Sequence, residues 1–288
     1  MKSETIKKKN IRAELEDDYK PDDNPETEIK KKVKEKIKEE LKTKDERLEL
    51  KLECKKSVLK SLHDKVGNLV DEITLSITKQ GLCTKQVDMS HVAMVDMTVK
   101  KSAFDEYRIN HECQVGLSLG TLEKHLKVYD GGDITVTNSD NQFILKGESG
   151  LVNKMGLLTV IDAEPKLPDI KFSVEAKVKA GNIMKMVSIA GEFGQEMLRF
   201  VVEHDELYIL METDTDSIRF PICAINRLDD SKDFETLYSV DYLKMLMNFD
   251  VSDTLKVKFG EDIPIYMGFE DKTIKCEYVL APRIETEG

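Results

Sequence analysis

The sequence predicts an α+β protein in which one type of domain occurs twice, and three observations lead to this prediction. Hydrophobic residues make up 40% of the 288 residues, which is enough for a substantial core. The composition changes near residue 47, from an almost wholly polar segment to alternating apolar residues. After this point, two consecutive stretches repeat one order of predicted elements: strand, helix, strands, helix, strands.

Residues 1–46 form a charged N-terminal extension that we predict to be disordered or partly helical. Acids and two prolines dominate residues 17–28, which hold too little apolar area to offset the entropy of the chain. Farther along, apolar residues recur at every fourth position, as on one side of a helix: Ile29, Val33, Ile37 and Leu41. This stripe fits either a solvated helix or plain disorder, or else a segment that binds a partner.

The first repeated stretch, residues 47–161, combines half-buried strands with two helices. Alternation from Leu48 to Cys54 predicts a strand with one buried side. Residues 55–70 carry apolar side chains at helical spacing, and a second short helix is predicted at 122–129, before Gly131 and Gly132. Apolar or alternating runs predict the remaining strands at 73–77, 92–99, 115–119, 134–136, 143–145 and 157–161.

The second stretch, residues 171–285, repeats this order. It opens with an alternating strand at 172–178 and a helix at 180–191, and residues 238–249 hold a strand end and a second short helix. The other predicted strands are 197–202, 207–211, 217–222, 255–259, 265–269 and 275–280. Residues 162–170 join the two stretches, and their charges and two prolines predict an extended connector.

Motifs that carry common enzyme chemistry are missing from the sequence. It has no Gly-rich phosphate-binding loop and no nucleophile elbow, and its five histidines are scattered. No two of its five cysteines form a Cys-x-x-Cys pair, and the acidic run from Glu212 to Asp216 is typical of a solvated loop. We therefore expect no catalytic residue, no metal and no cofactor, and we interpret the chain as a binding protein rather than an enzyme.

Charge and hydropathy limit how the protein can contact nucleic acid and where in the cell we expect it. The net charge of -11 would repel nucleic acid as a whole, so any contact with DNA must lie on a local basic surface. No apolar run approaches the roughly 18 residues that span a bilayer, and the N-terminus is charged rather than apolar. We expect an intracellular protein whose cysteines are buried in a reducing compartment.

Several segments, in order along residues 48–285, carry a resemblance to a known family: residues 88–99 with 104–108, 164–168, 238–243, 259–264 and 280–285. The first group, from Asp88-Met-Ser-His91 onwards, resembles the centre of the first domain of the proliferating cell nuclear antigen family. The next is similar to the end of the interdomain connector in archaeal clamps. The last three resemble the final helix and strand of the second domain and the family's C-terminal signature. The N-terminal extension has no counterpart in the usual family pattern.

This resemblance implies a fold and a function. The fold has two similar sliding-clamp domains per chain, with helices lining a central channel and antiparallel sheets outside, in a ring of three chains. The function is that of a DNA polymerase processivity factor, which encircles duplex DNA and tethers replication and repair enzymes. Contacts of Lys with phosphate suit this role, because they carry no sequence information and allow sliding.

The resemblance also implies partners and a location. The partners are duplex DNA, further copies of the chain, a clamp loader, and peptides of DNA polymerase, ligase and nuclease, with no membrane. The location is the nucleoid of the cytoplasm, or the nucleus in a eukaryote. Three other interpretations stay open: a specialised or heterotrimeric clamp subunit in repair or checkpoint loading, a DNA-processing enzyme, and an interaction protein that does not bind DNA.

Three sets of site residues follow from matching positions in the family. The residues expected to face DNA are Lys55, Lys56, Lys60, Lys65, Lys124, Lys127, Lys185 and Lys244. The residues expected to form a pocket for partner peptides are Val87, His91, Val92, Leu167, Pro264, Ala281, Pro282 and Ile284. The residues expected at the contact between subunits, on two exposed edge strands, are Met155, Leu157, Ile218 and Phe220.

Overall fold

The structure is a computed structural model of the chain, and it describes residues 48–160, 165–166 and 169–284. The contacts divide the chain between Leu48 and Glu49, close to the predicted end of the extension. The extension with its apolar stripe lies outside the described residues, as does most of the predicted connector. Within the described part, no helix is long and apolar enough to cross a membrane.

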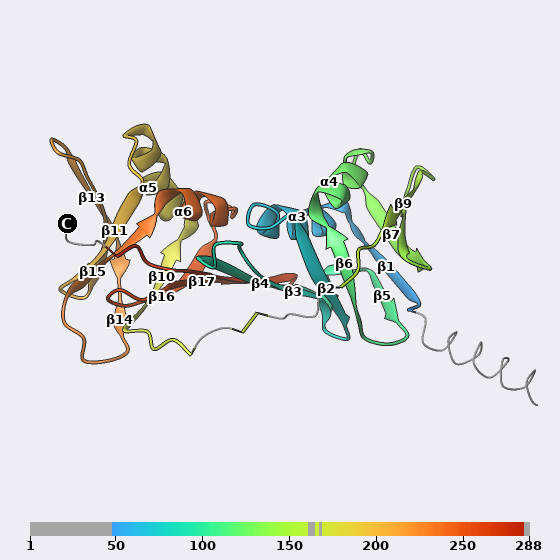
Figure 1. The fold of residues 1–288 in the computed structure, drawn as a ribbon, viewed down its shortest axis with the longest axis horizontal. Coiled ribbons are helices and arrows are strands. Elements are labelled where there is room, and N and C mark those ends of the chain that lie inside the picture. The colour runs from blue at the N-terminus through green and yellow to red at the C-terminus, as the bar shows by residue number, and fades with distance from the viewer. Residues whose placement is uncertain (1–47, 161–164, 167–168, 285–288) are drawn as a thin grey trace, which may run out of the picture. The chain divides into compact units, whose positions relative to one another are not determined.

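The first repeat, residues 50–156, follows the predicted order of strand, helix, strands, helix and strands (Figure 1). Its elements are β1 (Leu50–Lys55), α3 (Lys56–Val66), β2 (Glu72–Thr78), β3 (Gly81–Val87), β4 (Ala93–Lys100), η1 (Lys101–Ala103), β5 (Glu106–Ile109), β6 (Cys113–Ser118), α4 (Leu119–Lys127), β7 (Asp133–Ser139), β8 (Gln142–Gly147) and β9 (Val152–Gly156).

The second repeat, residues 174–280, matches the first element for element, apart from the short 3-10 turn η1. Its elements are β10 (Val174–Lys179), α5 (Ala180–Glu192), β11 (Met197–Glu203), β12 (Glu206–Glu212), β13 (Ser217–Ala224), β14 (Asn226–Arg227), β15 (Phe234–Ser239), α6 (Val240–Leu246), β16 (Thr254–Phe259), β17 (Ile265–Glu270) and β18 (Ile274–Leu280). The internal duplication inferred from the sequence is therefore present in the fold.

Each repeat divides its strands between two antiparallel groups. In the first repeat, five strands form one sheet in the order β5-β1-β7-β8-β9, and four more run β4-β3-β2-β6. The second repeat has the same two groups, β14-β10-β16-β17-β18 and β13-β12-β11-β15. Strand β18 pairs with β4, so the five-stranded group of one repeat and the four-stranded group of the other become a single nine-stranded sheet.

Side-chain alternation explains why these segments are strands and helices. Along β1, every second residue is buried, which places one side of the strand on the core. Each helix buries only one stripe, for example Leu59, Leu62 and Val66 of α3, and leaves polar residues on the opposite side. The antiparallel α+β class predicted from the sequence is thus confirmed.

Several elements differ from the sequence prediction. Strands β3, β5 and β14 were not predicted, and helix α4 spans Leu119–Lys127 where residues 122–129 were predicted. Helix α3 ends at Val66, and the N–H of Gly67 caps it by donating to the His63 carbonyl oxygen. The last strand of the first repeat is β9, whereas residues 157–161 were predicted; residues 157–160 lie beyond that strand. There, Leu158 pairs in an isolated bridge with Gly116, where an added Cβ would lie 2.7 Å from the Leu158 carbonyl oxygen.

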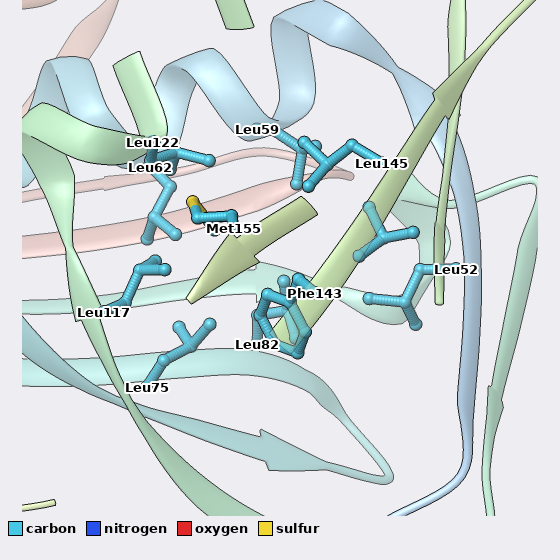
Figure 2. Close-up of a pocket in the computed structure, with 11 residues that line it drawn as sticks. Leu52, Leu59, Leu62, Leu75, Leu82, Leu117, Leu122, Phe143, Leu145 and Met155 are labelled. Carbon is cyan, nitrogen blue, oxygen red and sulfur yellow. The ribbon is translucent and has the colours of Figure 1, made fainter. Parts of the chain in front are cut away.

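The core of the first repeat lies between its two helices and its sheets. Figure 2 shows apolar side chains from α3, α4 and the strands converging on a gap of about 30 Å³. All residues that line this gap are apolar: Leu52, Leu59, Leu62, Leu75, Leu82, Leu117, Leu122, Val136, Phe143, Leu145 and Met155. Because no polar group reaches into it, the gap is a packing defect rather than a ligand site.

The core of the second repeat is built on aromatic rings. Phe200 packs edge-on against Tyr238 and Phe259, with centroid distances of 5.3 and 6.0 Å, and Phe234 packs on Phe259 at 5.6 Å. The Tyr238 hydroxyl donates a hydrogen bond to the Ile263 carbonyl at 2.9 Å, which satisfies the one polar group in this cluster.

Truncating a buried leucine should therefore destabilise the protein far more than truncating an exposed one. Leu198 is 0% exposed in this core and Leu228 is 48% exposed. We expect Leu198→Ala to lower the free energy of unfolding by about 2–5 kcal/mol, and Leu228→Ala by well under about 1 kcal/mol. Urea unfolding of both variants measures this; equal losses would contradict the assigned core.

Candidate functional site

The four helices carry exposed polar residues. They lie along one side of the described fold in Figure 1, with α3 packed on α4 and α5 packed on α6. Their sequences hold seven lysines against four acids, although the whole chain has a net charge of -11. We call this the helix surface, defined by the exposed residues of α3, α4, α5 and α6; it is a local basic region on an acidic protein.

The predicted DNA-facing lysines differ in what they contact. Lys124 and Lys244 are exposed and form no ion pair with the described residues. Lys60 pairs with Asp64 and Lys127 with Glu123, both one turn along the same helix, at 2.5 and 2.9 Å. Such exposed pairs contribute little to stability, so the ammonium groups can exchange a carboxylate for a phosphate.

Three further lysines of this set lie at the ends and edges of the helix surface. Lys55, at the end of β1, pairs with Asp133 at 2.5 Å. Lys56 donates to the Tyr129 carbonyl oxygen at 2.5 Å, and Lys185 of α5 lies 4.6 Å from the centre of the Phe220 ring. Because their ammonium groups already contact a carboxylate, a carbonyl oxygen and an aromatic ring, the helix surface is only moderately positive.

The side chain of Lys65 is directed elsewhere than the predicted contact with DNA. Its Nζ donates to the Asn248 carbonyl oxygen, and it lies 4.1 Å from the centre of the Phe249 ring. Because Asn248 and Phe249 both follow α6, the side chain is directed into the contact between the two repeats. The sequence around Lys65 gives no sign of this contact, because Asn248 and Phe249 are remote along the chain.

A buried carboxylate organises the loop between β3 and β4. Asp88 is 7% exposed, and its Oδ1 accepts hydrogen bonds from the backbone N–H groups of Val92 and Ala93, both at 2.7 Å. Its Oδ2 accepts from the Ser90 N–H at 3.0 Å and from the Tyr242 hydroxyl of α6 at 2.8 Å. One side chain thus fixes the loop and ties it to a helix of the other repeat.

The same hydrogen bonds determine the ionisation of Asp88. Burial opposes ionisation and is the largest single influence, but the bonds from Ala93, Tyr242, Ser90 and Val92 together outweigh it. The pKa of the Asp88 carboxyl therefore lies below its ordinary value. The neighbouring Met89 is almost fully exposed at the tip of this loop, and His91 has a left-handed backbone with φ of 56°.

The structure brings several predicted pocket residues together around this loop. Val92 accepts a backbone hydrogen bond from Ala281 at 2.8 Å, which places the chain after β18 beside the loop. Val87, Val92, Ala281 and Pro282 are half-buried there, whereas His91 and Ile284 are exposed. Pro264 is half-buried just before β17, and Leu167 lies outside the described residues.

Strands β9 and β13 are two of the strands that end a sheet in the described fold. Strand β9 ends the five-stranded sheet and β13 ends the four-stranded sheet, so each has a partner on one side only. Ile218 and Phe220 are half-buried on β13, and Leu157, also half-buried, follows β9. The side chain of Met155 is 1% exposed and faces the core of its own repeat, so the prediction that it contacts a second subunit is wrong for the side chain.

Sequence reasoning missed several residues at these places. Val128 after α4 is 53% exposed, and Phe193 after α5 is 46% exposed. Leu151 and Val152, at the start of β9, are also exposed. Exposed large apolar side chains are typical of contact surfaces, and only the fold shows that Leu151 and Val152 lie at the open edge strand β9.

Comparison with known proteins identifies similar chains. The family model described as "Proliferating cell nuclear antigen, N-terminal domain" matches residues 47–146. The DNA polymerase sliding clamp of Methanosarcina barkeri is 30% identical over 228 residues, which cover 76% of this chain and 92% of the relative. The DNA polymerase sliding clamp of Thermococcus sibiricus is 25% identical, covering 78% of this chain and 94% of the relative.

A solved structure has the same fold. It is described as the C-terminal region of FEN-1 bound to A. fulgidus PCNA, and it is similar with a TM-score of 0.75 and 25% identity. The match covers 83% of this chain and 100% of that chain.

Replacing Asp88 should make stability depend on pH in a defined way. We expect Asp88→Asn to lower the free energy of unfolding at pH 7 by about 1–3 kcal/mol, because an amide cannot accept all four bonds. The pKa of Asp88 is lower in the folded chain. The wild-type advantage is therefore complete above the ordinary pKa of about 3.9 and is lost as pH falls through the folded value.

Urea unfolding of wild type, Asp88→Asn and the exposed control Asp130→Asn, at several values between about pH 7 and pH 2, measures this difference. The gap between wild type and Asp88→Asn should close in acid, and the control should show no gap. A gap that grows as pH falls would contradict the hydrogen-bonded carboxylate.

Proposed function

Because the chain belongs to the proliferating cell nuclear antigen family of DNA sliding clamps, we propose that three copies of it close into a ring around duplex DNA. The chain is a DNA polymerase processivity factor and not an enzyme. The observation that carries the proposal is the internal duplication, because the pairing of β18 with β4 that joins the two repeats has open counterparts in β9 and β13.

The open edges of β9 and β13 are the counterparts of the two strands that pair within the chain. By element order, β9 corresponds to β18 and β13 corresponds to β4. Strands β18 and β4 pair antiparallel over seven residue pairs. If one chain offers β9 and the next offers β13, the same joint forms between chains, and a head-to-tail contact of this kind closes into a ring.

The hydrogen-bond registers predict which residues meet. Within the chain, Val279 of β18 lies opposite Met94 of β4. Following the paired registers from strand to strand, the counterpart of Val279 is Lys154, because Ile144 pairs with Lys154 as Tyr266 pairs with Val279. The counterpart of Met94 is Ser217, because Glu212 pairs with Ser217 as Val87 pairs with Met94.

The exposed apolar residues support this contact. Strand β9 is preceded by Leu151, and in the proposed register Leu151 of one chain meets Phe220 of the next, which already lies beneath Lys185. On the helix side, Phe193 follows α5 and Val128 follows α4, the two helix ends that the ring would bring together. Burying these side chains would contribute favourably to ring closure.

A pair of cysteines in the proposed register should link neighbouring chains. Residues directly opposite in an antiparallel pair are within disulfide distance, so the double variant Lys154→Cys, Ser217→Cys should form dimers and closed trimers on mild oxidation. Non-reducing gel electrophoresis measures this, with Lys154→Cys and Ser217→Cys alone as controls.

Only the double variant should form the trimer band. The single variants keep the same native cysteines, so they control for disulfides that those cysteines form. A double variant that stays monomeric on the gel would contradict the register. It would favour the alternative in which this chain pairs with a different clamp subunit.

The helix surface is the part of the chain that we propose to face DNA at the nucleoid. The lysines of this surface fit a sequence-independent contact with phosphates, and Lys124 and Lys244 are free to make it. In water, each phosphate contact that a lysine makes releases bound counterions, so the binding constant falls steeply with salt.

Removing two free lysines should therefore weaken the salt dependence of DNA binding. For the double variant Lys124→Gln, Lys244→Gln, the slope of log K against log salt should decrease in magnitude by about 1.8. Fluorescence anisotropy with a labelled duplex at several salt concentrations measures the slope. The matched control is Lys146→Gln, Lys177→Gln, two exposed lysines on the sheets; a larger change in the control would contradict the assigned surface.

The loop held by Asp88 and the chain after β18 form the surface that we propose for partner peptides. In the similar A. fulgidus protein, the C-terminal region of FEN-1 is bound. Here, the half-buried Val87, Val92, Ala281 and Pro282 gather beside a fixed loop, which suits a short peptide with apolar anchors. Nuclease, polymerase and ligase peptides and a clamp loader are the partners that we propose for it.

A further inference from the structure

The ends of α3 and α6 meet at the joint between the two repeats. Each helix approaches the other with its C-terminal turn, and four hydrogen bonds cross between them or join them to β18. Asn248 donates to the Asp64 carbonyl at 2.6 Å, and Asn68 donates to the Met245 carbonyl at 3.3 Å. Tyr278 donates to the Lys65 carbonyl at 2.7 Å, and Lys65 donates to the Asn248 carbonyl.

This arrangement brings like partial charges together. The last carbonyl groups of a helix have no partner inside it and carry partial negative charge. Two C-terminal turns that face each other therefore repel unless donors or a cation lie between them. The side chains of Asn68, Asn248 and Tyr278 supply neutral donors, and Lys65 supplies a cationic one.

The surroundings of Lys65 fit this role. Its ammonium group lies 4.1 Å from the centre of the Phe249 ring, whose face attracts a cation. Burial lowers its pKa, and nearby Asp253, Asp250 and Asp64 oppose this and favour the charged form. Phe249 in turn packs on Tyr278 at a centroid distance of 5.8 Å, so the cation is joined to the nine-stranded sheet.

The duplication provides an internal comparison. Lys65 of the first repeat corresponds to Ile189 of α5 in the second repeat. Phe249 of the second repeat corresponds to the exposed Val128 after α4 in the first repeat. The cation and its ring are therefore present at the joint within the chain and have no counterpart at the open ends.

We propose that Lys65 is a positioning residue of the clamp, whose ammonium group holds the C-terminal ends of α3 and α6 together and so fixes the angle between the two repeats. The role belongs to the single chain; only its consequence for closing the ring rests on the proposed function. It replaces the contact with DNA that the sequence predicted for this lysine.

Hydrogen exchange of the full chain tests this proposal. Lys65→Met keeps the length of the side chain and removes the charge, and Lys60→Met is the matched control on the exposed side of the same helix. We expect backbone exchange at residues 64–70 and 245–249 to become about tenfold faster in Lys65→Met, and to stay unchanged in Lys60→Met. Lys65→Arg, which keeps the positive charge, should restore slow exchange.

The same variants separate this role from DNA binding. Lys65→Met should leave the salt slope of DNA binding unchanged, whereas a lysine that contacts phosphate would reduce its magnitude by about 0.9. Unchanged exchange in Lys65→Met, or rescue by the neutral Lys65→Gln as complete as by Lys65→Arg, would overturn the proposal. If Lys65→Met does not fold, Lys65→Gln replaces it, with faster exchange expected at the same two segments.

These results are independent of the ring. A wild-type chain that remains monomeric would contradict the proposed function while leaving the exchange result interpretable, because α3 and α6 meet inside one chain.

Discussion

The pairing of β18 with β4 is the constraint on which the rest of the fold depends. A strand can pair on both sides, and the strand that ends a sheet leaves one side unpaired. Because the fold is duplicated, each such strand occurs once in each repeat. One edge from each repeat is satisfied when β18 pairs with β4, and the equivalent edges of β9 and β13 are left open. The proposed ring is the arrangement in which the same pairing satisfies those edges as well. The direction of the helices follows, because α3 to α6 lie on one side of these sheets.

Separation of charge explains how an acidic protein can offer a surface for DNA. Acids are spread over the sheets and loops, where several pair with lysines, as Glu175 does with Lys256 and Lys258. On the helix surface, lysines outnumber acids. Two of its lysines are paired within their own helix, so its positive charge is modest. A modest, exposed charge suits a contact that must form and break as the clamp slides, because each contact with phosphate is weak and screened by salt.

The two proposed contact regions are connected through α6. Its Lys244 belongs to the helix surface, and its Tyr242 donates to Asp88, which holds the loop beside the predicted peptide pocket. The end of α6 meets α3 through Asn248 and Met245. A helix of seven residues thus carries a basic side chain, fixes a loop of the other repeat and closes the joint between the repeats. Its short length leaves most of its stability to these tertiary contacts.

Local patterns in the sequence predicted the elements that have a clear period. The stripe of α3 and the alternation of β1 and β10 each reflect one buried side, and the repeated element order follows from them. Strand β3 escaped prediction because one of its buried residues is polar: Thr84 is 3% exposed and donates a hydrogen bond to the Thr74 carbonyl oxygen, so the apolar residues do not alternate. Strand β9 was misplaced because only Met155 is buried in it, while the more apolar residues 157–160 lie beyond its end.

Site residues were harder to predict than elements, for a physical reason. A lysine on an amphipathic helix has the same local sequence whether it faces solvent or a neighbouring repeat. Lys60 and Lys65 both lie on α3, yet one is exposed and the other contacts Phe249, far along the chain. Asp88 belonged to a recognised segment, but its four bonds depend on a loop closing on Tyr242. The side-chain direction of Met155 likewise depended on the true bounds of β9.

The mass of the full chain in solution tests the central claim most directly. The claim is that the joint made by β18 and β4 within one chain is repeated by β9 and β13 between chains. Light scattering on a sizing column, at micromolar concentration, should give three times the chain mass of 32.9 kDa. A mass of one chain that persists as concentration rises would contradict the claim, because the open edges of β9 and β13 would then have no partner among copies of this chain.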